Sequence, residues 1–292
     1  MHRIDAPMSE KQTTSADGTL ISYYVAGTGD NVWIIPPGLG TPLISWKYIF
    51  EEFHQRYTMI TWDARGTYNS GVPSDDSRMR VEDHVADLVA IKNAEKLDRF
   101  ALGGWSMAVQ ISLEYYNRFP DDVIALLLLN GTYEHVLSTA FQIPGANGLF
   151  TSILKLGRKF SSVFNPTVGY LLGMDNAVEI LRGFQIVTAN FDHFKVMVKD
   201  FRYLDWDVYF NMMLQYNEHS ALPYLEKVNV PTLITAGTKD KMTPVATAEF
   251  MRDHIKGSEL FIIPNGTHYT VAEYPEILNL RLDKFLRQNL DT

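Results

Sequence analysis

The chain has 292 residues, of which 46% are hydrophobic and 21% are charged, a composition typical of a globular protein. This length allows one large α/β domain, or one domain with an insertion. The formal net charge is −8 and there is no basic run, which argues against a nucleic-acid surface. Because the chain contains no cysteine, a disulfide framework, a thiolate zinc site and a cysteine nucleophile are all excluded.

The first ten residues lack the apolar core that a signal peptide needs. The longest apolar run, Val123–Leu129, has the length of a strand and is too short to cross a bilayer. We therefore expect a cytoplasmic protein with no membrane span, whose partner is a small-molecule substrate and not a nucleic acid. The sequence leaves the oligomeric state open.

Apolar runs and turn signals predict strands that alternate with helices up to residue 131. Residues 1–10 are expected to be a loose tail, and Asp17-Gly18 predicts a hairpin turn. The predicted strands are 11–15, 19–26, 32–35, 57–61, 100–102 and 123–129. The predicted helices are 46–54, 81–96 and 106–119. Such alternation favours the α/β class, with a doubly wound and mostly parallel sheet.

The pattern changes between residues 132 and 222, where no strand is evident. Nine of the 16 phenylalanines lie in this segment, and we interpret it as a helical insertion. Most of these side chains should pack in the insertion's own core, while a smaller share lines a pocket. The sheet pattern then resumes with a strand at 228–237, a helix at 244–254, a strand at 259–263 and a final helix at 269–290.

One short segment organises the functional prediction. Gly104-Trp-Ser-Met-Ala108 follows a buried strand and fits the nucleophile-elbow pattern. Small residues beside Ser106 would let the strand and the following helix approach closely around a strained serine backbone. The hydroxyl is then held above the sheet at a helix N-terminus, where negative charge is favoured. The alternative is an ordinary strand–turn–helix in which Ser106 is only the N-cap.

A serine nucleophile needs a base within hydrogen-bond reach. His268 is the histidine that directly follows a late strand, and Asp240 holds the equivalent place after the strand before it. An anion there would fix the tautomer of the imidazole and stabilise its protonated form. Taken alone, Asp240 could be a turn residue and His268 an ordinary loop histidine. Since all three residue types stand at carboxyl ends of strands, we predict that Ser106, Asp240 and His268 are catalytic.

An oxyanion hole requires two backbone N–H groups that face the developing negative charge. We predict that Met107, directly after the serine, supplies one of them, and that Leu39 in the loop after strand 32–35 supplies the other. Gly38 would let the backbone approach, although a plain Pro-Gly turn is the alternative reading of this loop. Gly38 and Trp105 are predicted to contact the substrate. We predict no cofactor-binding residue and no metal ligand.

With these residues in place, the chain resembles the α/β-hydrolase fold superfamily, and within it the serine esterases and lipases. The resemblance extends from about residue 19 to residue 290. It rests on the elbow around Ser106, on Gly237-Thr-Lys-Asp240 followed by Pro244, and on Gly266-Thr-His268.

The resemblance implies a domain organisation. Residues 1–132 and 223–292 would form the hydrolase core, and residues 133–222 would form a helical cap, or lid, over the active site. It also implies an ester-type hydrolase that works through an acyl-enzyme and needs no cofactor.

The chain departs from the family pattern in three places. Pro37 stands where a histidine is common in the oxyanion loop, and Ala108 replaces the usual glycine after the nucleophile. The segment 63–70 resembles the family's D-x-R-G-x-G-x-S loop, but Tyr68 stands where a glycine is usual. We expect Asp63 and Arg65 to be structural and to hold this loop in place.

The leading functional hypothesis is a carboxylesterase that acts on a small or medium apolar ester. Acyltransferases, thioesterases and carbon–carbon bond hydrolases use the same three catalytic residue types and remain alternatives. Dehalogenases and epoxide hydrolases use an aspartate nucleophile, and Ser106 argues against them. A ligand-binding homologue without turnover is a further alternative, because a fold does not determine a function.

Overall fold

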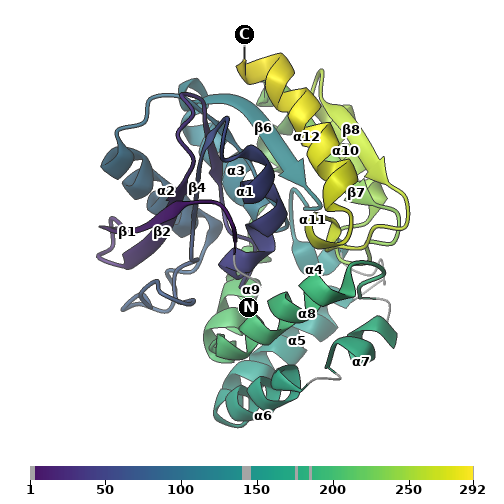
Figure 1. The fold of residues 1–292 in the computed structure, drawn as a ribbon. Coiled ribbons are helices and arrows are strands. Elements are labelled where there is room, and N and C mark those ends of the chain that lie inside the picture. The colour runs from purple at the N-terminus through teal and green to yellow at the C-terminus, as the bar shows by residue number, and fades with distance from the viewer. Residues whose placement is uncertain (1–3, 140–145, 175–176, 184–185, 292) are drawn as a thin grey trace.

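The computed structural model describes residues 4–139, 146–174, 177–183 and 186–291 (Figure 1). Its centre is a single sheet of eight strands, most of which coincide with apolar runs of the sequence. The strands are Met8–Thr14 (β1), Leu20–Ala26 (β2), Val32–Ile35 (β3), Thr58–Trp62 (β4), Phe100–Leu102 (β5), Val123–Leu129 (β6), Thr232–Gly237 (β7) and Glu259–Ile263 (β8).

The strands lie in the order β1-β2-β4-β3-β5-β6-β7-β8. β1 and β2 pair antiparallel, as do β2 and β4, whereas every pair from β4 to β8 is parallel. From β3 the chain adds β4 on one side and then crosses over to add β5 to β8 on the other. A sheet that reverses in this way has a crevice at the carboxyl ends of the strands beside the reversal. The predicted fold class, an α/β fold with a doubly wound and mostly parallel sheet, is confirmed.

Helices cover both faces of the sheet because alternate residues of its central strands point to opposite sides. In β3, Ile34 belongs to the apolar core on one face, and Trp33 and Ile35 belong to the core on the other. The first face is covered by Val81–Glu95 (α2), Ala108–Arg118 (α3) and Val245–His254 (α10). The second is covered by Lys47–Phe53 (α1), Thr270–Glu273 (α11) and Pro275–Leu290 (α12).

Between β6 and β7 the chain leaves the sheet and forms a layer of helices, drawn in green on one side of the core (Figure 1). These helices are Val136–Thr139 (α4), Ala146–Lys159 (α5), Ser161–Gly173 (α6), Ala177–Gly183 (α7), Phe191–Asp200 (α8) and Trp206–Tyr216 (α9). Short 3-10 helices occur at Leu43–Trp46, Pro120–Asp122, Phe201–Tyr203 and Leu222–Lys227.

The two ends of this helical layer are tied together where the layer joins the core. The backbone N–H of His135 donates to the carbonyl of His219 over 3.1 Å, and the N–H of Ala221 donates to the carbonyl of Tyr133 over 2.8 Å. The layer therefore leaves and re-enters the core at one place, as a segment inserted into a loop does.

Several predicted boundaries are wrong, each for a local reason. Residues 8–10 are not part of a tail, because they pair with β2 and extend β1 to Met8. The last helix is broken in two at Pro275, whose missing N–H suits the first turn of α12. Helix α3 begins at Ala108, two residues after the predicted start, because the backbone of Ser106 is not helical. Strand β7 begins at Thr232, directly after Pro231, and not at residue 228.

No helix in the described part of the chain is both long enough and apolar enough to cross a bilayer.

A buried arginine joins the loop after β4 to the core. The Arg65 side chain is 1% exposed, and its Nε donates to Asp87 of α2 over 3.0 Å. The guanidinium also donates to Asp17 in the first hairpin and to the backbone carbonyl of Arg78, both over 2.7 Å. Arg65 thereby connects the hairpin, the loop and α2.

We expect Arg65→Met to lower the free energy of unfolding by about 3–5 kcal/mol, because it leaves the carboxylate of Asp87 buried without its cation. Urea denaturation at pH 7 measures this change. Arg287→Met removes an exposed arginine that pairs with Asp283, and should cause no measurable loss. Equal losses in the two variants would contradict the structural role of Arg65.

Candidate active site

The turn between β5 and α3 is built around Ser106. The backbone of Ser106 has a φ of +66°, a left-handed conformation that is strained for a residue with a side chain. A Cβ atom at Gly103 would lie 2.1 Å from the carbonyl oxygen of Leu127, so only glycine fits at that position. At Gly104 a Cβ atom would lie 3.1 Å from Cβ of Ala108. A small residue is therefore required at position 108, where this chain has alanine.

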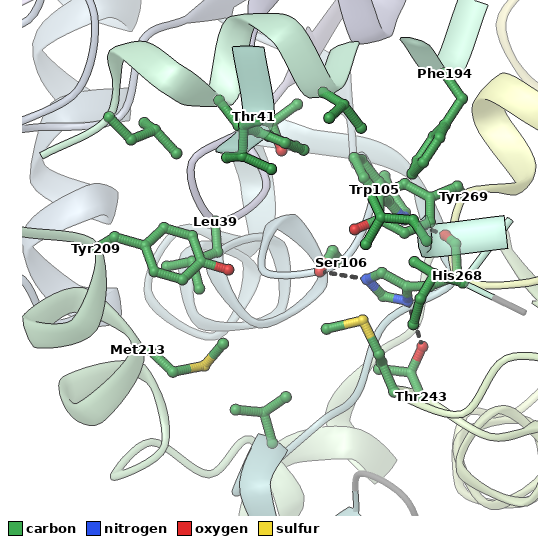
Figure 2. A pocket seen from close by; sticks show the side chains of 18 of the residues that line it. Leu39, Thr41, Trp105, Ser106, Phe194, Tyr209, Met213, Thr243, His268 and Tyr269 are labelled. Carbon is green, nitrogen blue, oxygen red and sulfur yellow. Dashed lines mark hydrogen bonds between the residues drawn. The ribbon is translucent and has the colours of Figure 1, made fainter. Parts of the chain in front are cut away.

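Ser106, His268 and Asp240 form one hydrogen-bonded chain. Figure 2 shows the contact between Ser106 and His268. The distance from the Ser106 hydroxyl oxygen to Nε2 of His268 is 2.9 Å. Nδ1 of His268 lies 3.0 Å from Oδ2 of Asp240. In the tautomer that carries its proton on Nδ1, His268 donates to Asp240 and accepts from Ser106. The structure thus brings together the three residues that the sequence placed after β5, β7 and β8.

Asp240 is 5% exposed, yet every side of its carboxylate has a donor. Oδ1 accepts from the backbone N–H groups of Met242 and Thr243, over 2.9 and 2.8 Å. Oδ2 accepts from the Thr243 hydroxyl over 2.8 Å as well as from His268. Burial alone would raise the pKa of Asp240, but His268 and the hydrogen bonds from Thr243 outweigh it and hold the pKa below its usual value. Asp240 is therefore ionised at neutral pH.

Asn130 is a residue of this site that our sequence reasoning missed. Its Nδ2 donates to Oδ2 of Asp240 over 3.2 Å and to the carbonyl of Thr267 over 3.3 Å. Its Oδ1 accepts from the hydroxyls of Thr235 and Thr270, over 3.2 and 2.6 Å. Asn130 thus connects the Asp240 loop to the His268 loop. The signal in the sequence was an asparagine directly after a buried strand, a residue type that tolerates the observed φ of +41°.

The predicted oxyanion-hole residues lie next to the serine. Leu39 lines the same pocket as Ser106 (Figure 2), and Met107 directly precedes α3, where the helix dipole is positive. No described residue accepts a hydrogen bond from the backbone N–H of Leu39 or of Met107. A Cβ atom at Gly38 would lie 3.6 Å from Cβ of Ser106 and 2.4 Å from the Thr41 hydroxyl oxygen. The glycine therefore lets this loop come close to the serine.

Trp105 forms part of the wall of the pocket and also supports His268. Its indole Nε1–H donates to the backbone carbonyl of His268 over 2.6 Å. The Trp105 ring also packs against the rings of His268 and Tyr269, with centroids 5.3 Å away in each case. The position of the imidazole therefore depends on Trp105, which the sequence suggested only as a substrate contact.

The pocket above Ser106 holds about 190 Å³ of space accessible to water. Its walls come from both the core and the inserted helices, and Figure 2 shows their side chains pointing into the space above the serine. The apolar side chains include Leu39, Leu172, Phe194, Phe201, Leu204, Met213 and Met242. None of the described lining residues is an aspartate, glutamate, lysine or arginine, and the polar groups include the hydroxyls of Thr41, Tyr209 and Thr243.

The loop after β4 supports the loop after β3, which holds the predicted oxyanion residue Leu39, through Tyr68. The Tyr68 hydroxyl donates to the carbonyl of Gly40 over 2.8 Å. Tyr68 has a φ of +45°, a conformation that glycine adopts without strain, which accounts for the glycine that is usual at this position in the α/β-hydrolase pattern. The tyrosine accepts some backbone strain, and its side chain fixes a loop that borders the pocket.

One cluster of described side chains has the spacing of metal ligands: Glu82, Glu114 and His219. The oxygens of Glu114 are already bonded to Arg118, to His219 and to the hydroxyl of Tyr224. Burial would raise the pKa of Glu114, but these partners lower it to about 2. We interpret the cluster as a structural network on the helix that follows the serine.

Asp63, at the start of the same loop as Tyr68, is a buried carboxylate that forms no ion pair with a described residue. It accepts hydrogen bonds from the Tyr24 hydroxyl over 2.9 Å and from the Asn69 N–H over 3.1 Å. Burial is the largest effect and raises the pKa of Asp63 to about 6. Between about pH 4 and pH 6 the folded state therefore binds more protons at this site than the unfolded state does. The contribution of Asp63 to stability consequently falls as the pH rises through this range.

Asp63→Asn keeps an oxygen that can accept these bonds and removes the charge. We expect the stability of the variant, relative to the parent protein, to rise by roughly 2–3 kcal/mol between pH 4 and pH 7. Urea denaturation at several pH values measures this difference. Asp30→Asn, the same change at an exposed position, serves as the control. Parallel pH profiles of the Asp63→Asn variant and the parent would contradict the buried-carboxylate assignment.

Comparisons with protein-family models agree with the fold. A model described as alpha/beta hydrolase fold matches residues 31–151, and a model described as TAP-like protein matches residues 212–290. Three of the inserted helices, α6, α7 and α8, lie between the two matched segments.

Known proteins are similar to the chain over nearly its whole length. Serine hydrolase BPHL of Homo sapiens is 21% identical over 276 residues, which cover 94% of this chain and 85% of that protein. The 3-oxoadipate enol-lactonase 2 of Acinetobacter baylyi is 21% identical over 283 residues, covering 95% of this chain and 97% of that protein. Among solved structures, an esterase from Exiguobacterium antarcticum has a TM-score of 0.75 and 19% identity, covering 96% of this chain and 100% of that one.

Proposed function

The chain belongs to the α/β-hydrolase fold superfamily and is a hydrolase, and we propose that it cleaves carboxylic esters through an acyl-enzyme on Ser106. The observation that carries this proposal is the hydrogen-bonded chain from Ser106 through His268 to Asp240, at the base of an apolar pocket. A neutral serine hydroxyl is a weak nucleophile, and a base at 2.9 Å is the group that can activate it.

Acylation begins when the Ser106 oxygen attacks the ester carbonyl and its proton passes to Nε2 of His268. Asp240, which is ionised, stabilises the imidazolium that forms. The carbonyl oxygen gains a negative charge, and the backbone N–H groups of Leu39 and Met107 are available to bind it. The C–O bond to the alcohol then breaks, and His268 returns the proton to the departing alcohol oxygen.

Deacylation repeats these steps with water. His268 takes a proton from a water molecule, whose oxygen attacks the acyl carbonyl and forms the acid. The bond to Ser106 breaks, and the serine oxygen regains its proton from His268. Every proton transfer in this cycle uses His268, and the steps require only side chains, backbone N–H groups and water.

The pocket supports a small or medium, uncharged and mainly apolar ester. It holds about 190 Å³, and among the described residues that line it no lysine, arginine, aspartate or glutamate is present. In this proposal Trp105 and Gly38 border the bound ester, and residues 133–222 act as the cap that covers it. Such a cover would exclude water and strengthen the interactions at the oxyanion.

Acyl transfer to an alcohol is a second candidate, and the apolar walls of the pocket favour it because they suit an alcohol acceptor better than water. It would use the same residues in the same roles. Product analysis with an added alcohol separates the two reactions. Formation of free acid alone at high alcohol concentration would exclude transfer.

We expect Ser106→Ala to lower kcat/KM for p-nitrophenyl butyrate by about a thousandfold or more, because it removes the hydroxyl that forms the acyl-enzyme. Steady-state release of p-nitrophenol measures the loss. Ser152→Ala, an exposed serine on α5, should retain the parent activity. Parent-level turnover by the Ser106→Ala variant would refute the assignment of the nucleophile.

A further inference from the structure

Tyr209 is a pocket residue that the proposed cycle does not use. It lies on α9, and its ring packs against the oxyanion loop, since a Cβ atom at Gly40 would lie 3.0 Å from two of its ring carbons. Figure 2 shows its hydroxyl directed into the pocket toward Ser106, from the side opposite His268. The ring is thus fixed by packing, and its polar end faces the reacting serine.

Among the described residues, none accepts a hydrogen bond from the Tyr209 hydroxyl. Burial raises the pKa of Tyr209 to about 12, so the phenol keeps its proton at neutral pH. No described residue donates a hydrogen bond to this hydroxyl either. By contrast, the hydroxyl of Tyr68, which borders the same loop, donates to the carbonyl of Gly40.

The proposed cycle indicates which part of an ester would reach Tyr209. His268 must return a proton to the departing oxygen, so the alcohol half of the ester lies on the His268 side of Ser106. The acyl half then extends away from His268, toward the side of the pocket where Tyr209 stands. This step rests on the proposed function.

An apolar acyl chain would leave the Tyr209 hydroxyl buried without a hydrogen-bond acceptor. It would displace water from the hydroxyl and offer no acceptor in exchange, and an unpaired buried donor is unfavourable. An acyl chain with an oxygen at the right position would satisfy it. That oxygen should be neutral, because none of the described lining residues is a lysine or arginine that could pair with a carboxylate.

We infer that Tyr209 is a specificity-determining residue that donates a hydrogen bond to a neutral oxygen in the acyl chain. The substrate class is therefore esters of short alkoxy or keto acids, in preference to esters of plain alkanoic acids of the same length.

Matched p-nitrophenyl esters test this inference on the full chain. p-Nitrophenyl pentanoate, 3-methoxypropanoate and ethoxyacetate have acyl chains of the same length, and an ether oxygen replaces one methylene in the last two. The p-nitrophenyl monoester of glutaric acid carries a carboxylate instead. Each kcat/KM is divided by the rate constant for hydroxide hydrolysis of the same ester, which removes differences in intrinsic reactivity.

We expect the parent protein to favour at least one alkoxy ester over the pentanoate by roughly 10- to 100-fold after this correction. Tyr209→Phe should bring that ratio close to one. Tyr170→Phe removes a hydroxyl from an exposed tyrosine on α6 and should preserve the ratio. Thermal unfolding of each variant shows whether the fold is retained. If Tyr209→Phe does not fold, the ratio of alkoxy-ester to pentanoate activity in the parent protein still tests the predicted preference.

Three results would overturn the inference. The first is a corrected ratio near one in the parent protein, and the second is a ratio that Tyr209→Phe leaves unchanged. The third is an equal loss of activity toward the alkoxy ester and the pentanoate in Tyr209→Phe, which would place Tyr209 at the reacting carbonyl. A preference for the glutarate monoester would contradict the inference that the acceptor oxygen in the acyl chain is neutral. Failure of the proposed function is a separate result, in which none of these esters is turned over or Ser106→Ala turns them over as the parent does.

Discussion

The left-handed backbone of Ser106 is the constraint on which the rest of the site depends. Such a conformation costs about 1–2 kcal/mol for a residue with a side chain, and the surrounding structure holds it in place. The Ser106 N–H donates to the carbonyl of Leu129 over 3.0 Å, and its own carbonyl accepts from Val109 at the start of α3 over 3.0 Å. Because β5, β6 and α3 meet around it, the serine oxygen can only point out of the sheet. The same turn leaves the N–H of Met107 without a described acceptor.

A buried carboxylate extends this constraint to the other strand ends. Asp240 is taken out of water, which is unfavourable unless donors surround it, and Thr243, Met242, Asn130 and His268 provide those donors. These contacts fix the imidazole as well as the carboxylate. The loops after β6, β7 and β8 therefore form one network, and His268 faces Ser106 without depending on a bound substrate for its position.

Much of this arrangement could be predicted from the sequence, because parallel strands bring their carboxyl ends together. Alternating apolar runs predicted the sheet, and residue type at the strand ends pointed to Ser106, Asp240 and His268. The contributions of Asn130, Tyr68 and Tyr209 could not be predicted in this way. Their effects depend on side-chain direction and on positive φ angles, which result from packing between distant segments. The bounds of the helices within 132–222 could not be predicted from the sequence either, since apolar side chains there face both a local core and the pocket.

The most direct test of the central claim is the mass of the enzyme during turnover. Rapid quenching after mixing with p-nitrophenyl butyrate, followed by intact mass and peptide analysis, detects any covalent intermediate. A butyryl group on the peptide that contains Ser106, formed as fast as the first p-nitrophenol is released, is the result that we predict. Turnover in which an acyl group accumulates on another residue, and never on Ser106, would contradict the account.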